Sequence, residues 1–177
     1  GLIILILIER KAKSPVLPLS LFKNSIVSIS MIVGFLMNAG MMGAMIYLPF
    51  FVQGVEGVSP TKSGFINMPM SLTMIVLSTL VGRWISKTGK YKRYALMGMP
   101  FMVVAMILMA FMSNIATAVV SMIIFGVGLG LSMPVFTLTV QNAVAPSMLG
   151  VATATNTLFR NLGGTIGIAI MGTMMNA

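Results

Sequence analysis

The chain of 177 residues is 58% hydrophobic and only 7% charged, and it carries a formal net charge of +9. With a mean hydropathy of +1.04, it has more apolar surface than a soluble domain of this length can bury, so the hydrocarbon core of a bilayer must serve as solvent. Neither Cys nor His occurs, and the two acids are Glu9 and Glu56. This composition excludes zinc sites, thiol chemistry and His-based triads, and we expect no enzyme activity.

Residues 1–8 form an apolar run that is too short to span a bilayer and lacks the basic segment that precedes the core of a signal peptide. We interpret this run as the end of a preceding transmembrane helix, and the chain as part of a larger protein. Pro15 and Pro18 break any helix in residues 9–25, which we interpret as a cytoplasmic interfacial linker. The side chains of this linker that can lie against the membrane surface are Leu17, Leu19, Leu21 and Phe22.

Five long apolar stretches follow, each near or above the ~20 residues that a helix needs to cross a bilayer. They cover residues 26–52, 65–86, 95–112, 116–140 and 149–175. An outside loop is expected over residues 53–62, and Pro134 is expected to kink the fourth helix. The sequence therefore predicts an all-α, polytopic transmembrane bundle over residues 26–177.

Basic residues lie on one side of this predicted bundle. The first stretch is preceded by Arg10, Lys11, Lys13 and Lys23, and the second is followed by Lys87, Lys90, Lys92 and Arg93. The turns on the opposite side carry only Lys62. Because Lys and Arg concentrate in cytoplasmic loops, we expect residues 9–25, 87–94 and 141–148 to be cytoplasmic, in a bacterial plasma membrane. Loops beside anionic lipid headgroups account for the positive charge, so nucleic acid is not an expected partner.

The third stretch, residues 95–112, has no polar side chain and therefore no face suited to a wet cavity. We expect it to lie on the outside of the bundle, against lipid. The other four stretches carry polar side chains at membrane depth, which normally face other helices or a water-filled path. The sequence therefore predicts four helices around a cavity and one that supports them.

Arg160 lies about eleven residues into the fifth stretch, roughly 16 Å along its axis. A charged group at that depth costs at least ~2.5 kcal/mol unless it is partnered or hydrated. The alternative interpretation is a side chain that snorkels to the inner headgroups. Neither Glu lies within a span, so any carboxylate partner must come from sequence outside this chain. The residues that we predict to contact the substrate cavity or its gate are Asn38, Asn67, Asn156 and Arg160.

Pairs of glycines recur at a spacing of four residues. They are Gly126 and Gly130 in the fourth stretch, and Gly163 and Gly167 in the fifth. Small residues at this spacing let helix backbones approach closely, so we predict a role in helix packing. No strand precedes residues 126–134, so a dinucleotide-binding loop is excluded. Where any of the twenty Met residues line a cavity, their flexible side chains can repack around apolar ligands of different shape.

Residues 82–93, with the sequence GRWISKTGKYKR, resemble the loop motif of the major facilitator superfamily as it is repeated in the carboxy-terminal half. The matching residues are Gly82, Gly89, Lys87, Lys90 and Arg93. Ser86 replaces the usual Asp of the motif, so the charge-relay role of that Asp does not carry over. Residues 15–22, 126–134, 141–142, 150–152 and 160–167 are similar to the fourteen-helix drug:proton antiporter group of that superfamily.

This resemblance implies that the five stretches are helices nine to thirteen of such a transporter, the third being an outer helix and the other four lining the cavity. It implies proton-coupled efflux of amphipathic drugs, cationic or neutral, by alternating access, with a proton gradient as energy source and no cofactor. The basic residues Lys87, Lys90 and Arg93 would orient the inner loop and help to lock the outward-open state. The acidic coupling residues and the amino-terminal half, a necessary partner, would lie outside this chain.

Two other functions remain open from the sequence. The same fold can export a metabolite, a lipid or a siderophore, because fold does not fix substrate. A membrane scaffold or sensor that transports nothing is the second. Intramembrane acids in the missing half would favour cationic drugs, and uptake driven by a pH gradient would separate a carrier from a scaffold.

Overall fold

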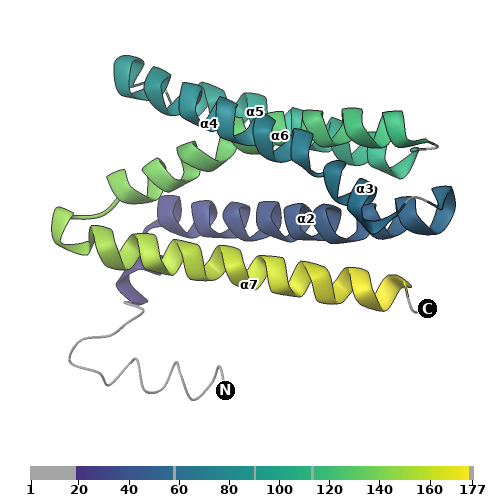
Figure 1. Cartoon of the computed structure of the whole chain (residues 1–177). Coiled ribbons are helices and arrows are strands. Elements are labelled where there is room, and N and C mark those ends of the chain that lie inside the picture. The colour runs from purple at the N-terminus through teal and green to yellow at the C-terminus, as the bar shows by residue number, and fades with distance from the viewer. Residues whose placement is uncertain (1–18, 58, 90, 113, 176–177) are drawn as a thin grey trace.

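The computed structural model describes residues 19–57, 59–89, 91–112 and 114–175. Within them every regular element is helical and no strand occurs, which confirms the predicted all-α bundle (Figure 1). In chain order the elements are the 3-10 helix η1 (Leu19–Lys23), α2 (Ser25–Glu56), α3 (Pro60–Phe65), α4 (Met68–Thr88), α5 (Lys92–Ala110), α6 (Ile115–Asn142), the 3-10 helix η2 (Pro146–Met148) and α7 (Leu149–Met175). The predictions for residues 1–18 and for Lys90 lie outside the described residues.

Polar caps and one glycine fix several helix ends. Asn24 begins α2 by accepting a hydrogen bond from the backbone N–H of Ile26 at 3.0 Å. Asn114 and Thr117 form a reciprocal capping box at the start of α6, which satisfies backbone N–H groups that have no partner within the helix. Gly89 ends α4 with a φ of 66°, a left-handed conformation that glycine adopts without a side-chain clash. The turn between α4 and α5 therefore depends on a glycine of the loop motif.

The central element is α6, which packs extensively against both α4 and α5, while α2 and α7 form the other closely packed pair. Figure 1 shows the last third of α6 sloping away from α4 and α5 toward α7. Pro134 lies at the start of this last third, where it removes one backbone donor from the helix. Val135 of α6 is buried with residues of α4, whereas Val140 is buried with residues of α2 and α7. Thus α6 joins the two groups of helices.

Four helical segments among the described residues are long and apolar enough to cross a membrane. They are Ser25–Gly54, Thr61–Thr88, Lys92–Ala110 and Ile115–Asn142. With 27 residues, or about 40 Å, α7 is also long enough to cross a membrane. Its Thr, Asn and Arg residues lower its mean hydropathy, so it is not among the four sufficiently apolar segments. The fifth crossing stays a prediction.

The outer connection between α2 and α4 differs from the expected loop over residues 53–62. The helix α2 continues to Glu56, and α3 already begins at Pro60. Residues 66–67 then interrupt the second predicted stretch, and α4 begins at Met68. Pro69 stands in the first turn of α4, where its missing N–H costs nothing and its fixed φ suits the helix. The second predicted span therefore consists of a short helix and a long one.

The described part of the linker is folded against protein. Leu21 in η1 is 4% exposed and is buried together with Val27 and Val140. The prediction that Leu21 lies against the membrane surface is wrong, because η1 covers the inner ends of α2, α6 and α7. The ring of its neighbour Phe22 lies 5.5 Å from that of Phe159 on α7.

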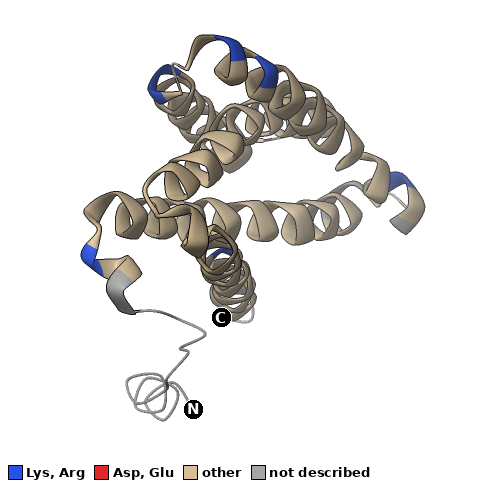
Figure 2. Cartoon of the chain, turned by 90° about the vertical axis from the view of Figure 1, so that its left-hand side faces the viewer, with Lys and Arg blue, Asp and Glu red and all other residues tan. Residues whose placement is uncertain are grey.

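The helices alternate in direction, so the start of α2, the α4–α5 turn and the α6–α7 connection share one end of the bundle (Figure 1). This end carries the exposed Lys23, Lys87, Lys92 and Arg93, whereas Lys62 lies in the connection at the other end. Figure 2, viewed toward this end, shows most of the blue positions at the ends of helices. The fold therefore separates the charges as the cytoplasmic-loop rule requires.

The exposure of α5 is that of an outer helix. Its buried residues are Gly98, Met102 and Ala105, which form a narrow stripe against α6. Gly98 and the Ser132 hydroxyl of α6 are so close that any side chain at Gly98 would overlap with that oxygen. Beyond the stripe the surface of α5 is apolar and open, as at Leu96, which is 60% exposed. This surface fits contact with lipid.

Candidate functional site

Glycines allow α7 to pack directly on the backbone of α2. A methyl group at Gly167 would lie 2.6 Å from the carbonyl oxygen of Ala39, and one at Gly163 would overlap with the carbonyl oxygen of Phe35. On α6, a methyl group at Gly126 would lie 2.6 Å from the carbonyl oxygen of Met70 on α4. Gly130 also packs against α4, because a methyl group there would lie 2.8 Å from the Cβ atom of Leu77. All four predicted packing glycines thus lie where two backbones approach.

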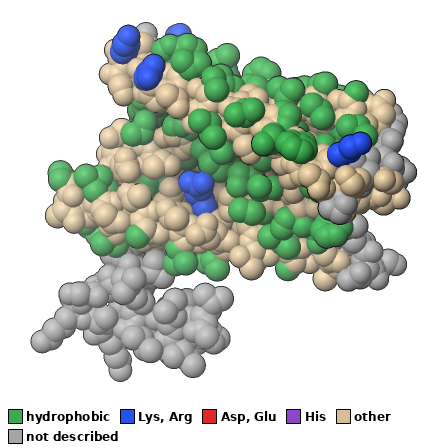
Figure 3. Space-filling model, viewed as in Figure 1, with side chains coloured by type: hydrophobic (Ala, Val, Ile, Leu, Met, Phe, Trp, Pro, Cys, Tyr) green, Lys and Arg blue, Asp and Glu red, His purple; other side chains and the backbone are tan. Residues whose placement is uncertain are grey.

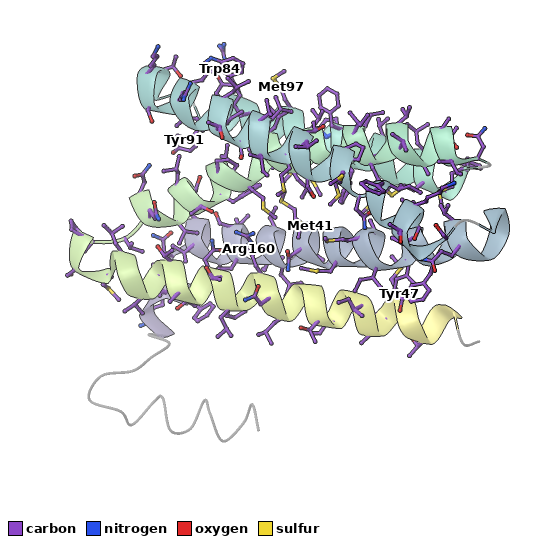
Figure 4. The ribbon with its side chains drawn as sticks, in the orientation of Figure 1. Met41, Tyr47, Trp84, Tyr91, Met97 and Arg160 are labelled. Atoms are coloured by element: carbon purple, nitrogen blue, oxygen red, sulfur yellow. The ribbon has the colours of Figure 1, made fainter. Side chains whose placement is uncertain are left out.

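Arg160 projects from α7 where α2 and α6 also meet (Figure 4). Its aliphatic stem packs over Gly34 of α2, because a methyl group there would lie 3.1 Å from Cγ of the arginine. The guanidinium Nη2 donates to the Sδ atom of Met133 at 3.2 Å, and a thioether sulfur is a weak acceptor. In Figure 3 a blue patch stands away from the ends of the molecule, at the position that Figure 4 labels Arg160. The guanidinium is therefore half-buried yet reachable from one face.

Arg160 has no carboxylate partner among the described residues. Glu56 stands at the far end of α2, 22 positions from Gly34, which is about 33 Å along a helix. Glu9, the other acid of the chain, lies outside the described residues. Within the described residues the charge consequently lacks the ion pair that usually accompanies a charged residue in the membrane.

Two asparagines accompany Arg160. Asn38 of α2 is 3% exposed, and its Nδ2 donates to the backbone carbonyl oxygen of Arg160 at 2.7 Å. Gly164 permits this approach, because a methyl group there would lie 2.6 Å from that Nδ2. Asn156, one turn before Arg160, is also 3% exposed, but its Oδ1 has no hydrogen-bond partner. Three of the four residues predicted for the cavity or gate are therefore together, and one of them leaves an unsatisfied buried acceptor.

A small cavity lies among these residues. Its lining consists of Gly34, Met37, Met133, Phe136, Thr137, Asn156 and Arg160. Its volume of about 10 Å³ is room for about one water molecule. We call this cavity and its lining the Arg160 notch. Sequence reasoning did not single out Gly34, although a glycine within an apolar helix is a signal of close approach.

The fourth predicted residue, Asn67, lies elsewhere. It stands between α3 and α4, and its Nδ2 donates to the backbone carbonyl oxygen of Met45 on α2 at 2.9 Å. Met45 is seven positions beyond Asn38, or about 10 Å along α2. The structure therefore does not bring Asn67 to the Arg160 notch.

Most of the other polar side chains within the helices bond to their own backbone. Thr137, Thr139 and Thr155 each donate to the carbonyl oxygen four residues earlier, as Ser71 and Thr73 also do. Such bonds satisfy a hydroxyl group without any partner on another helix. These hydroxyl groups therefore do not by themselves indicate a cavity, although Thr137 also lines the Arg160 notch.

A larger, apolar groove lies between α2, α5 and α7, nearer their outer ends. Its volume is about 490 Å³, within the range of pockets for small molecules. The side chains along it are Gly40, Gly43, Ala44, Tyr47, Leu48, Met106, Met109, Ala110, Met112 and Met171. The hydroxyl of Tyr47 donates to the carbonyl oxygen of Ile168 on α7 at 3.2 Å. The outer third of α5 therefore lines a groove. The sequence predicted α5 only as a supporting helix and did not predict this contact.

The loop motif lies at the inner ends of α4 and α5. Lys87 and Arg93 are exposed, Ser86 donates to the carbonyl oxygen of Gly82, and a methyl group at Gly82 would meet nothing within 4 Å. That Lys87, Lys90 and Arg93 help to lock an outward-open state stays a prediction. Among the described residues, no three His, Cys, Asp or Glu side chains gather to hold a metal ion.

Membrane-length helices in alternating directions, basic residues at one end and a charged notch where three helices meet define a multi-pass membrane protein. The chain belongs to the Major Facilitator Superfamily, whose family model matches residues 5–168. This match confirms the superfamily that residues 82–93 indicate.

Individual relatives carry names that refer to drugs. The multidrug transporter protein MdtP of Bacillus subtilis (strain 168) is 39% identical over 180 residues, which cover 100% of this chain and 33% of that protein. A tetracycline resistance determinant of Streptomyces rimosus is 33% identical over 183 residues, covering 100% of this chain and 52% of that protein. Multidrug resistance protein 3 of Bacillus subtilis (strain 168) is 30% identical over 171 residues, which cover 95% of this chain and 33% of that protein. The chain thus spans about a third to a half of the length of these relatives.

Proposed function

We propose that the full-length protein exports amphipathic drugs across a bacterial plasma membrane by alternating access. The observation that carries this proposal is the Arg160 notch, where three helices meet around a half-buried cation that forms no ion pair with any described residue. Arg160 stands about 16 Å from the start of α7, and Gly34 about 14 Å from the start of α2. Both depths are near the middle of a hydrocarbon core about 30 Å thick, which is where transporters of this kind hold substrate.

The names of the relatives support drugs as the cargo, and so does the groove between α2, α5 and α7. Four Met side chains line it, and unbranched thioethers adapt to apolar molecules of different shape. A transporter that accepts many drugs needs such an adaptable surface more than it needs a fixed set of hydrogen bonds. We therefore assign contact with the apolar body of the substrate to the groove, and contact with its polar group to the notch.

A proton gradient is the proposed energy source. The described helices hold no acid within their membrane-spanning parts, because Glu56 lies beyond the spanning segment Ser25–Gly54 of α2. The groups that bind and release the coupling protons are consequently assigned to the rest of the protein, which the chain needs as the second half of an alternating-access pair.

Transport by purified full-length protein in proteoliposomes tests the proposal. With an acidic lumen, protons leave in exchange for substrate, and an amphipathic fluorescent dye should accumulate inside until a protonophore collapses the gradient. Vesicles without protein are the control for passive entry. Absence of accumulation in protein-containing vesicles that hold their gradient would reject the exporter and favour a scaffold or sensor.

A further inference from the structure

The Arg160 notch has an unused set of hydrogen-bonding groups. A guanidinium has five N–H donors in a planar fork, and the structure gives the side chain of Arg160 one partner, the Met133 sulfur. A second observation is independent of the first: the buried Oδ1 of Asn156 has no partner. Both side chains line the same small cavity, so the unused donors and the unused acceptor are available to a single group.

The size and chemistry of the notch select that group. Its free volume of about 10 Å³ admits about one oxygen-sized atom, so a ligand can place one oxygen inside while the rest of its polar group stays at the open face beside the guanidinium. A carboxylate is planar and matches the guanidinium fork with two parallel hydrogen bonds. When it is protonated, the same group has an O–H that Oδ1 of Asn156 can accept. Each protonation state of a carboxyl group thus finds a partner in the notch.

We propose that the Arg160 notch binds a carboxyl group. Two sources have this chemistry: an acidic side chain from the part of the protein outside this chain, or an acidic group of the transported molecule. The second source rests on the proposed function, whereas the first does not. In either case the charge that these described helices contribute is positive, so a preference for cationic drugs would require acids elsewhere in the protein.

Binding measured on the purified full-length protein tests this inference without any transport step. Benzoate and benzamide are matched probes that differ in the carboxylate, and hydrogen bonds to charged groups make a preference of about tenfold or more the expected result. If the carboxylate comes from substrate, wild-type protein prefers benzoate and Arg160→Gln loses the preference. Lys62→Gln, which removes an exposed cation of α3, should retain it.

If the carboxylate comes from the protein itself, the wild-type notch is occupied and shows no preference. Replacing the intramembrane acids one at a time by their amides should then open the notch to benzoate in one variant. Asn156→Asp places a carboxylate one helical turn before Arg160, so it should fill the notch and abolish benzoate binding even if Arg160→Gln does not fold. The inference is overturned if benzoate preference survives Arg160→Gln or Asn156→Asp, or if neither the wild type nor any acid-to-amide variant shows it. Loss of transport with benzoate binding intact would instead reject the proposed function alone.

Discussion

Asn38 on α2 donates a hydrogen bond of 2.7 Å to the backbone carbonyl oxygen of Arg160 on α7. The two residues are 122 positions apart, and the bond joins the closely packed helices α2 and α7 at the level of the Arg160 notch. Asn38 therefore holds the backbone of α7 against α2 at the position of Arg160.

Replacing Asn38 with Ala should destabilise the full-length protein by about 0.6 kcal/mol, the average for hydrogen bonds between membrane helices, and by no more than about 1.7 kcal/mol. The midpoint of thermal unfolding in detergent measures the change. Ser86→Ala is a suitable control, because the exposed Ser86 bonds within its own helix. Equal midpoints for the wild type and Asn38→Ala would show that the bond contributes nothing to stability.

Gly163→Ala should cost about 1–3 kcal/mol, because the new methyl group overlaps with the backbone of α2 and must push α7 away. Gly82→Ala is the matched variant: its methyl group meets nothing within 4 Å, and alanine is the better helix former by about 1 kcal/mol. The two variants should move the unfolding midpoint in opposite directions. A similar small effect of both substitutions would contradict the close packing of α2 and α7.

Arg160→Ala should reduce drug efflux by about tenfold or more if the notch acts in transport, while the protein still reaches the membrane. Efflux of a fluorescent drug from intact cells measures the loss, and membrane immunoblots measure the amount of protein. Lys62→Ala removes an exposed cation of α3, outside the loop motif, and should leave efflux unchanged. Wild-type efflux in the Arg160 variant would remove this residue from the mechanism.

Ala110→Trp should narrow the groove between α2, α5 and α7 and weaken export of large drugs more than of small ones. The groove volume of about 490 Å³ leaves room for an indole to occupy space that a large drug would need. Leu96→Trp changes another exposed position of α5, outside the groove, and should have no such effect. If both variants export a size series of drugs alike, the groove is not part of the substrate path.

Single cysteines should report the orientation of the helices, because this part of the chain contains no natural cysteine. In a background without other cysteines, an impermeant thiol reagent added to whole cells should label Lys62→Cys and leave Lys23→Cys unlabelled. Thr173→Cys, near the end of α7, should be labelled like Lys62→Cys if α7 crosses the bilayer. Labelling of Thr173→Cys only after permeabilisation would place the end of α7 on the inner side.

Several features could be read from residue types in chain order. The apolar residues 95–112 indicate a helix with a lipid-facing surface, and the structure leaves most of the apolar side chains of α5 exposed. The four-residue spacing of Gly163 and Gly167 predicts a close helix contact, and the structure gives α2 as the partner. Such features depend on local periodicity, which a single sequence contains in full.

The sequence by itself thus determined the helical membrane class and the alternating direction of the helices, because hydropathy and charge act on each segment separately. Only the tertiary structure decided that Asn38 and Asn156 stand beside Arg160 while Asn67 does not, and that the outer part of α5 enters a groove. The rotation of a helix about its axis and its choice of neighbours are set by side-chain packing between segments more than a hundred residues apart, and no pattern within one helix encodes them.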